Sequence, residues 1–132
     1  MKKVLFVCVH NSGRSQIAEA FFNQLSKGEV RAFSAGTDPD KNVDSAIASI
    51  MMEEDIDITG QMPTLLVPEM TNEAAKVVTM GCGVGNICPA PNIPIDDWGL
   101  DDPKGQSIEK VRAIRDDIKM RVIDLLKELE SE

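Results

Sequence analysis

The chain has 132 residues, of which 42% are hydrophobic and 27% are charged, and its formal net charge is -8 at pH 7. This length and balance predict one globular domain spanning residues 1–132. The acidic excess argues against a nucleic-acid partner, because phosphate-backbone binding needs clustered Lys and Arg. No apolar run reaches the roughly 20 residues of a membrane-spanning helix, and the start does not read as a signal peptide. We therefore expect a cytoplasmic protein with no membrane partner.

The first half of the chain alternates between strand and helix patterns. Residues 4–7 form a short apolar run, which predicts a central strand covered on both faces. From Ser15 onward, apolar residues recur at helical spacing and stop at Lys27 and Gly28. The pattern predicts a second strand at residues 30–34 and a loop at residues 35–39. A second helical stripe then begins at Ala46 and ends near Asp55.

The second half continues this alternation. Residues 62–71 contain two prolines and an apolar stretch, and the pattern leaves their structure open. Residues 75–80 predict a third buried strand, and a glycine-rich stretch follows it. Residues 93–95 predict a short edge strand, because a central proline removes a ladder donor. After a loop at 98–103, a long amphipathic helix is expected. Its apolar stripe is Ile108, Val111, Ile114, Ile118, Val122, Leu125, Leu126 and Leu129.

Strands that alternate with helices predict an α/β fold in which a parallel sheet lies between two helix layers. In such sheets the active site lies beyond the carboxyl ends of the strands. Cys8, Ser34 and Cys82 all fall at these predicted ends. With Cys88, the chain has three cysteines, an odd number that argues against a structural disulfide framework. We expect them to be reactive or buried.

The loop between the first strand and the first helix carries the strongest chemical signal. Five residues separate Cys8 from Arg14, and the loop runs directly into a helix. Its backbone amides and the helix N-terminus are expected to form a concave site for an oxyanion, and Arg14 can hold two oxygens as a planar fork. These positive surroundings favour the thiolate of Cys8, which makes it a candidate nucleophile. Asn11 and Ser12 can hold the loop and hydrogen-bond the sulfur.

At this point the sequence resembles the low-molecular-weight protein tyrosine phosphatase superfamily and, within it, the arsenate reductases that use thioredoxin or a small thiol. The matching segments cover nearly the whole chain in the family's order. They are Cys8-Val9-His10-Asn11-Ser12-Gly13-Arg14-Ser15, Ser34-Ala35-Gly36-Thr37, Val77-Val78-Thr79-Met80-Gly81-Cys82, Cys88-Pro89 and Trp98-Gly99-Leu100-Asp101-Asp102-Pro103. The resemblance implies a single three-layer domain with a four-stranded parallel sheet in the flavodoxin-like order 2-1-3-4.

The same resemblance implies the residue roles of an arsenate reductase. The substrate-binding loop would comprise Val9, His10, Asn11, Ser12, Gly13, Arg14 and Ser15. Cys8 would form a thiol-arsenate adduct, and Cys82 would then attack its sulfur, releasing arsenite. Cys88 would take over the disulfide, and thioredoxin or a glutaredoxin-type small-thiol system would reduce it. Asp102 matches the family's general acid, with Asp101 as the alternative.

Some features of the chain favour a small inorganic substrate or leave the reductant open. Phosphatases of this group follow the proline after the acid with tyrosine, whereas Lys104 and Gly105 stand here and the chain has no tyrosine. Thioredoxin-linked relatives typically place six residues between the last two cysteines, whereas five separate Cys82 from Cys88. Gly81 before Cys82 instead resembles the branch served by small thiols. We expect no bound cofactor, and a monomer.

A metal is not predicted at this site. Potassium-binding relatives use an asparagine, a serine, a threonine and an aspartate. Asn11 and Ser34 match the first two, but Met62 and Thr64 stand near the others. His10, the only histidine, is interpreted as a loop residue.

Two alternatives to the reductase remain. One is a phosphatase that hydrolyses phosphate monoesters through a Cys8 phosphocysteine, with Arg14 and Asp102 only. The other is a noncatalytic oxyanion-binding or redox-sensing module with a regulatory disulfide between Cys8 and Cys82.

Overall fold

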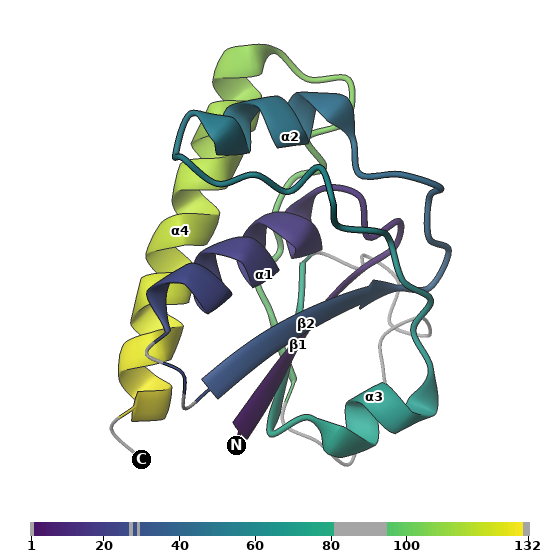
Figure 1. Ribbon diagram of the computed structural model, residues 1–132, viewed down its shortest axis with the longest axis vertical. Coiled ribbons are helices and arrows are strands. Elements are labelled where there is room, and N and C mark those ends of the chain that lie inside the picture. Colours follow the sequence, from purple (N-terminus) through teal and green to yellow (C-terminus); the bar gives the residue numbers. More distant parts are fainter. Residues whose placement is uncertain (1, 27, 29, 81–94, 131–132) are drawn as a thin grey trace.

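The computed structural model describes residues 2–26, 28, 30–80 and 95–130. Figure 1 shows how the elements follow one another from the N-terminus to the C-terminus. They are β1 (Lys2–Cys8), α1 (Arg14–Leu25), β2 (Val30–Gly36), α2 (Ser45–Met52), α3 (Pro68–Glu73), β3 (Lys76–Thr79), β4 (Ile95–Asp97) and α4 (Ile108–Glu130). In this described part of the chain, no helix has both the length and the apolar character needed to cross a bilayer.

The four strands form one sheet in the order β2-β1-β3-β4, and every neighbouring pair is parallel. The predicted α/β class and the order 2-1-3-4 are therefore confirmed. β1 and β2 pair along their whole length, from Lys2 opposite Val30 to Cys8 opposite Gly36. Because the strands are parallel, their carboxyl ends share one edge of the sheet, and Cys8 ends β1 at that edge.

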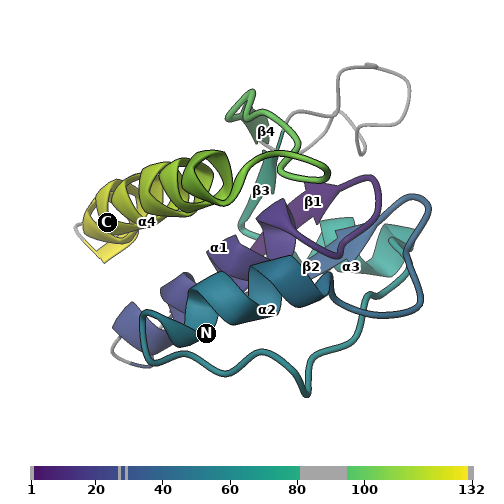
Figure 2. The same ribbon diagram turned by 90° about the horizontal axis from the view of Figure 1, so that it is seen from above.

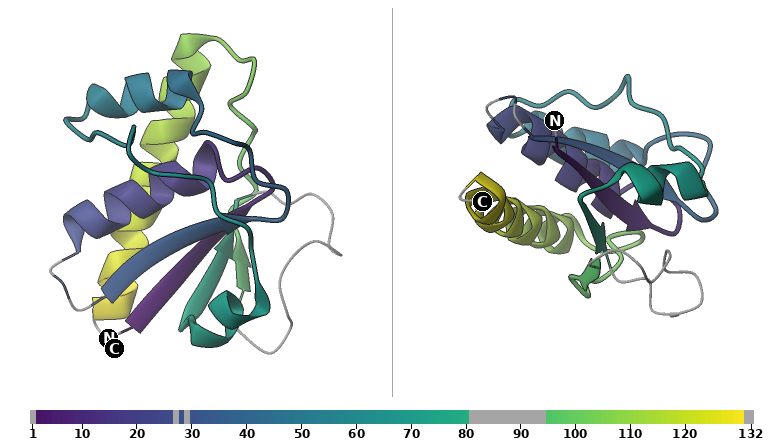
Figure 3. Two further views of the ribbon diagram at one scale, coloured as in Figure 1. Left: turned by 45° about the vertical axis from the view of Figure 1, so that its right-hand side comes forward. Right: turned by 90° about the horizontal axis from the view of Figure 1, so that it is seen from below.

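Helices cover both faces of the sheet. In Figure 2 and Figure 3, α1, α2 and α4 lie on one side of it and the short α3 lies on the other. β1 serves both faces, because successive side chains of a strand point to opposite sides. Val4, Phe6 and Cys8 belong to the large core under α1 and α4, while Leu5 and Val7 belong to the smaller core near α3.

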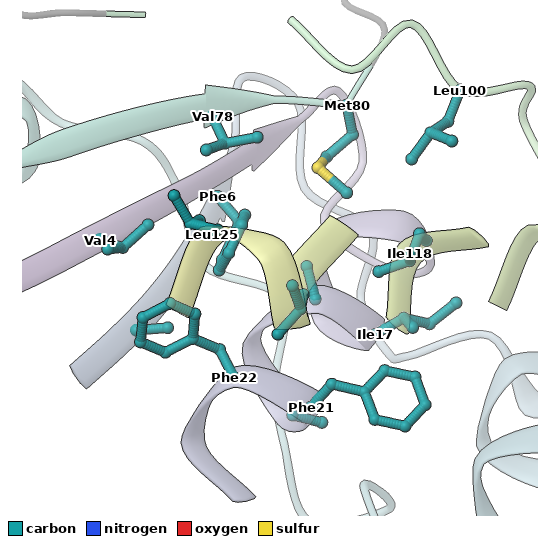
Figure 4. Close-up of a cluster of buried hydrophobic side chains, with 14 of the residues drawn as sticks. Val4, Phe6, Ile17, Phe21, Phe22, Val78, Met80, Leu100, Ile118 and Leu125 are labelled. Carbon is teal, nitrogen blue, oxygen red and sulfur yellow. The ribbon is translucent and has the colours of Figure 1, made fainter. Parts of the chain in front are cut away.

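The large core accounts for most of the apolar pattern read from the sequence. Phe6 packs edge-on against Phe22 of α1, with ring centroids 5.9 Å apart. Figure 4 shows the side chains of β1, α1, β3 and α4 converging in this region. Ile118 of α4 is fully buried there, but Ile108, the first residue of the predicted stripe, is 41% exposed. Ile108 is the first residue of α4.

The structure corrects two predicted boundaries. β2 continues through Gly36, whereas the sequence pattern assigned residues 35–39 to a loop, because Ala35 and Gly36 pair with Val7 and Cys8 of the neighbouring strand. The edge strand predicted at 93–95 is β4 at Ile95–Asp97, which pairs with Val77 to Thr79; residues 93 and 94 lie outside the described residues.

The stretch that the sequence left open, residues 62–71, divides into two parts. Leu65 forms an isolated parallel bridge with Gly36, which extends the pairing beyond β2. α3 then begins with Pro68 in its first turn, where a proline costs no helical hydrogen bond.

Candidate active site

Among the residues that the structure describes, two groups hydrogen-bond the sulfur of Cys8, and both come from the loop that follows it. Cys8 is only 4% exposed, and the backbone N–H of Asn11 donates to its Sγ at 3.2 Å. The hydroxyl oxygen of Ser15 lies 2.8 Å from the same sulfur. The Asn11 side-chain amide donates to that hydroxyl oxygen at 2.7 Å, so the hydroxyl proton is not used in that contact and can be donated to a thiolate sulfur.

This arrangement revises one prediction about the loop. We expected Asn11 and Ser12 side chains to bond the sulfur. The structure shows instead the backbone of Asn11 and the side chain of Ser15 in that role. Asn11 occupies a left-handed conformation, with φ 49°, which asparagine tolerates better than most residues. Its side-chain oxygen accepts from the backbone N–H of Thr64 at 2.8 Å, so a distant segment also fixes the loop.

The five carbonyl groups from Val9 to Gly13 accept hydrogen bonds from residues that follow the loop in the chain. The donor and acceptor pairs are Asp38 N with Val9 O at 2.8 Å, Asp40 N with His10 O at 3.0 Å, Gln16 Nε2 with Asn11 O at 3.0 Å, Asp44 N with Ser12 O at 3.0 Å, and Ile17 N with Gly13 O at 3.0 Å. A peptide unit is planar, and its C=O and the next N–H point in opposite directions. The loop amides are therefore turned toward the concave side, where Asn11 N meets the sulfur.

Arg14 is the first residue of α1 and is 9% exposed. Its Nη1 donates to the carbonyl oxygens of Met80 at 2.7 Å and Leu100 at 2.8 Å. The segments that follow β3 and β4 thus bind the Arg14 guanidinium on its Nη1 side. Because Nη1 already donates to these two carbonyls, the Nε and Nη2 edge is the part of the guanidinium suited to bidentate hydrogen bonds with two oxyanion oxygens.

A cavity opens over Cys8 and brings together three segments that are far apart in the sequence. Its lining residues are Cys8, His10, Ser12, Gly13, Arg14, Asp44, Ile47, Asp102, Pro103 and Lys104. Arg14 and Lys104 supply positive charge, and Asp44 and Asp102 supply negative charge. This mixture allows one group to bind an anion while another transfers a proton.

The two candidate general acids are separated by the structure. Asp102 lines the cavity, and its Oδ1 accepts a hydrogen bond from the backbone N–H of Lys104 at 3.0 Å. Asp101 instead forms an ion pair with Lys110, with Nζ and Oδ2 2.9 Å apart. The hydrogen bond from Lys110 lowers the pKa of Asp101, which keeps that carboxylate ionised. Asp102 is therefore the better placed of the two to protonate a leaving group.

The remaining predicted residues do not all lie within the described part of the chain. Cys82 and Cys88 fall in residues 81–94 and lie outside the described residues. Ser34 donates its hydroxyl to Glu19 Oε1 at 2.7 Å, and burial raises the pKa of Glu19. Among the residues that the structure describes, no group of three or more His, Cys, Asp and Glu side chains is arranged to hold a metal ion.

Sequence reasoning missed the residues that support the loop from outside. Gln16 is 1% exposed, and its amide reaches the Asn11 carbonyl. A polar residue directly after the loop, next to an apolar stripe, was the only available signal. Asp38, Asp40 and Asp44 gave none, because acidic residues in a polar stretch look like an ordinary solvated loop.

Comparison with known proteins identifies the family. The family model for low molecular weight phosphotyrosine protein phosphatase matches residues 3–132 of this chain. The chain therefore belongs to the low molecular weight phosphotyrosine protein phosphatase family.

Particular relatives divide between reductases and phosphatases. The chain is 41% identical to the glutaredoxin arsenate reductase of Synechocystis over 96% of its own length and 97% of that protein. It is 36% identical to the structure of an arsenate reductase in the phosphate binding state, covering 97% of this chain and 98% of that one with a TM-score of 0.84. The structure of a low molecular weight protein tyrosine phosphatase from T. tengcongensis is 25% identical to this chain. The match covers 97% of this chain and 99% of that one, with a TM-score of 0.85.

Proposed function

We propose that this protein is an arsenate reductase in which Cys8 is the nucleophile. The observation that carries the proposal is the cavity over Cys8, where Ile47, Pro103 and Lys104 stand beside the anion loop and where no Phe, Tyr or Trp lines the part that the structure describes. Ile47, Pro103 and Lys104 are not side chains on which a phosphotyrosine ring would stack, whereas the positive charge of Lys104 suits a free oxyanion. The identity to the Synechocystis relative, which is named as an arsenate reductase, supports the same substrate.

The first step forms a covalent adduct. The Cys8 thiolate attacks arsenic, and one arsenate oxygen leaves as water after protonation, with Asp102 as the proton donor. The loop amides and the Nε and Nη2 edge of Arg14 hold the remaining oxygens. Ser15 and the Asn11 N–H stabilise the sulfur before the attack.

The second step is the reduction, and it requires a second thiolate. Cys82 attacks the Cys8 sulfur, the sulfur-arsenic bond breaks, and its electron pair reduces As(V) to As(III), which leaves as arsenite. Cys82 follows Met80 by two residues, and the Met80 carbonyl contacts Arg14.

Cys88 completes the cycle by attacking Cys82, which frees Cys8 and leaves a Cys82 to Cys88 disulfide. An external dithiol or small-thiol system, thioredoxin or a glutaredoxin type, reduces this disulfide. The name of the Synechocystis relative favours the glutaredoxin type. In this proposal the protein acts as a monomer in the cytoplasm and binds no cofactor of its own.

Arsenate turnover in substituted proteins tests the relay. Arsenite formation should be measured with an excess of dithiol, and with thioredoxin or glutaredoxin systems, in the wild type and in Cys8→Ser, Cys82→Ser and Cys88→Ser. We expect no turnover without Cys8 or Cys82, and stalled turnover without Cys88. Retained multiple turnover in Cys82→Ser would rule out the three-cysteine relay.

Hydrolysis of phosphate esters is the second candidate function, because Asp102 lines the cavity as a phosphatase acid would. Hydrolysis of an aryl phosphate that survives Cys82→Ser and Cys88→Ser but not Cys8→Ser would establish it. If hydrolysis greatly exceeds arsenate reduction in the wild type, the phosphatase assignment replaces the reductase.

A further inference from the structure

Asp40 contacts the anion loop at two points, although it lies in the segment after β2. Its backbone N–H donates to the His10 carbonyl at 3.0 Å. Its carboxylate oxygen Oδ2 accepts the hydroxyl of Ser12 at 2.8 Å. Its other oxygen, Oδ1, is 3.8 Å from Nδ1 of His10. A single residue from outside the loop thus contacts two of the loop's seven members.

The Ser12 contact determines what that side chain can do. Ser12 lines the cavity, but its hydroxyl proton is donated to Asp40 and so points away from a bound anion. Ser12 therefore contributes its backbone amide to an oxyanion rather than its hydroxyl. Its side chain connects the loop to the segment after β2.

We propose that Asp40 is a positioning residue for oxyanion binding, which fixes the peptide planes of the loop through Ser12 and His10. The Asp40 N–H holds the His10 carbonyl, and the Asn11 N–H of the same peptide unit therefore points at the sulfur. The hydrogen bond from Ser12 to the Asp40 carboxylate keeps the following amides directed toward the concave side of the loop as well. The inference rests on the proposed function only in taking this loop as an oxyanion site. It does not depend on whether arsenic is reduced there.

Positioning and simple electrostatics predict opposite results for this residue. A carboxylate near an anion site repels the anion, so its removal should strengthen binding if charge alone mattered. If Asp40 orients the loop, its removal should weaken binding, because unaligned amides make poorer hydrogen bonds. Asp38 provides a matched control. It is an exposed carboxylate of the same segment that contacts the loop through its backbone N–H and carbonyl.

The experiment measures inorganic phosphate binding to the full chain by calorimetry, in the wild type, Asp40→Leu, Asp40→Asn and Asp38→Leu. We expect Asp40→Leu to weaken phosphate binding about tenfold. Asp40→Asn should stay within about twofold of the wild type, because its amide oxygen still accepts the Ser12 hydroxyl. Asp38→Leu, which removes the same charge, should bind phosphate as tightly as the wild type or more tightly.

A further pair of variants distinguishes a positioning role of Asp40 from a folding defect in Asp40→Leu. Ser12→Ala removes the same hydrogen bond from the other side, so adding Asp40→Leu to it should change phosphate affinity by less than about twofold. Unchanged or tighter binding in Asp40→Leu, or full additivity in the double variant, would overturn the inference. A wild type that binds no phosphate would overturn it too, whereas phosphate binding without arsenate turnover would count only against the proposed reductase.

Discussion

Each partner of the Cys8 sulfur is itself held by a further residue. The hydroxyl of Ser15 is oriented by the side-chain amide of Asn11, and Asn11 is held in turn by the backbone of Thr64. The sulfur therefore lies against neutral polar groups that the fold holds in place before a substrate arrives. Such preorganised donors stabilise a charged group more effectively than donors that must first reorient.

The separation of Asp101 from Asp102 gives a prediction at this scale. Asp102→Asn should lower kcat for arsenate reduction by about 10²- to 10⁴-fold, because the leaving oxygen loses its acid. Asp101→Asn should change kcat by less than about threefold, since the Asp101 carboxylate is paired with Lys110 and does not line the cavity over Cys8. Steady-state kinetics with matched reductant would decide, and equal losses in the two variants would contradict the assignment.

The end of β2 is packed directly against the anion loop. Gly36 pairs with Cys8, and its N–H donates to the Thr64 carbonyl at 2.8 Å. A Cβ at position 36 would lie 2.5 Å from the Val9 carbonyl oxygen and 3.0 Å from the backbone nitrogen of Asn11. Glycine is thus required for close approach, since the atoms in the way belong to the loop backbone.

Gly36→Ala should therefore weaken phosphate binding at least tenfold and lower the melting temperature, because the loop must shift to relieve the contact. Gly60→Ala is the matched control, since a Cβ there meets nothing within 4 Å. Calorimetric binding and thermal unfolding of both variants provide the measurement. Normal phosphate affinity in Gly36→Ala would show that the loop tolerates this displacement.

An ion-pair cluster joins the end of α2 to α4. Glu53 accepts hydrogen bonds from Arg112 at 2.7 Å and from Arg115 at 2.8 Å. These two hydrogen bonds, the one from Arg112 first, lower the pKa of Glu53 from 4.5 to about 2. Because the folded pKa is lowered, the stabilisation is present above pH 4.5 and is lost as the pH falls toward about 2.

Glu53→Gln should accordingly lower the free energy of unfolding at pH 7, and its difference from the wild type should shrink as the pH falls from about 4.5 to about 2. Chemical denaturation across this pH range provides the measurement. Asp124→Asn, which alters an exposed carboxylate of α4, is the control and should show little difference at any pH. A Glu53→Gln effect that persists unchanged at low pH would argue against the ion pairs as its cause.

At the scale of the whole molecule, α4 closes the larger core. Its buried residues contact α1 and the sheet, and Ile118 is fully buried among them. Ile118→Ala should cost about 2–5 kcal/mol of unfolding free energy, because it leaves a cavity that close-packed neighbours fill poorly. Met120→Ala, at a position of the same helix that is 60% exposed, should cost less than about 1 kcal/mol. Equilibrium unfolding provides the measurement. A similar loss of unfolding free energy in the two variants would mean that the core around residue 118 relaxes to fill the cavity.

The apolar pattern predicted the elements of this core well. Periodicity marked β1, α1, α2, β3 and α4, since burial of one stripe or of both strand faces leaves a direct trace in the sequence. It failed at the end of β2, where pairing with β1 rather than local preference keeps Ala35 and Gly36 in the strand. It also left α3 open, because a short helix with a small apolar contact has almost no period to read.

The amino-acid sequence by itself determined the alternation of strands and helices and the place of Cys8 and Arg14 in one loop, because both depend on residues close together in the chain. Only the tertiary structure decided that Ser15 faces the sulfur and that Asp102 rather than Asp101 lines the cavity. It alone showed that Asp38, Asp40 and Asp44 hold the loop from outside. These contacts join residues far apart in the chain, and their geometry is set by the packing of the sheet and helices rather than by local spacing.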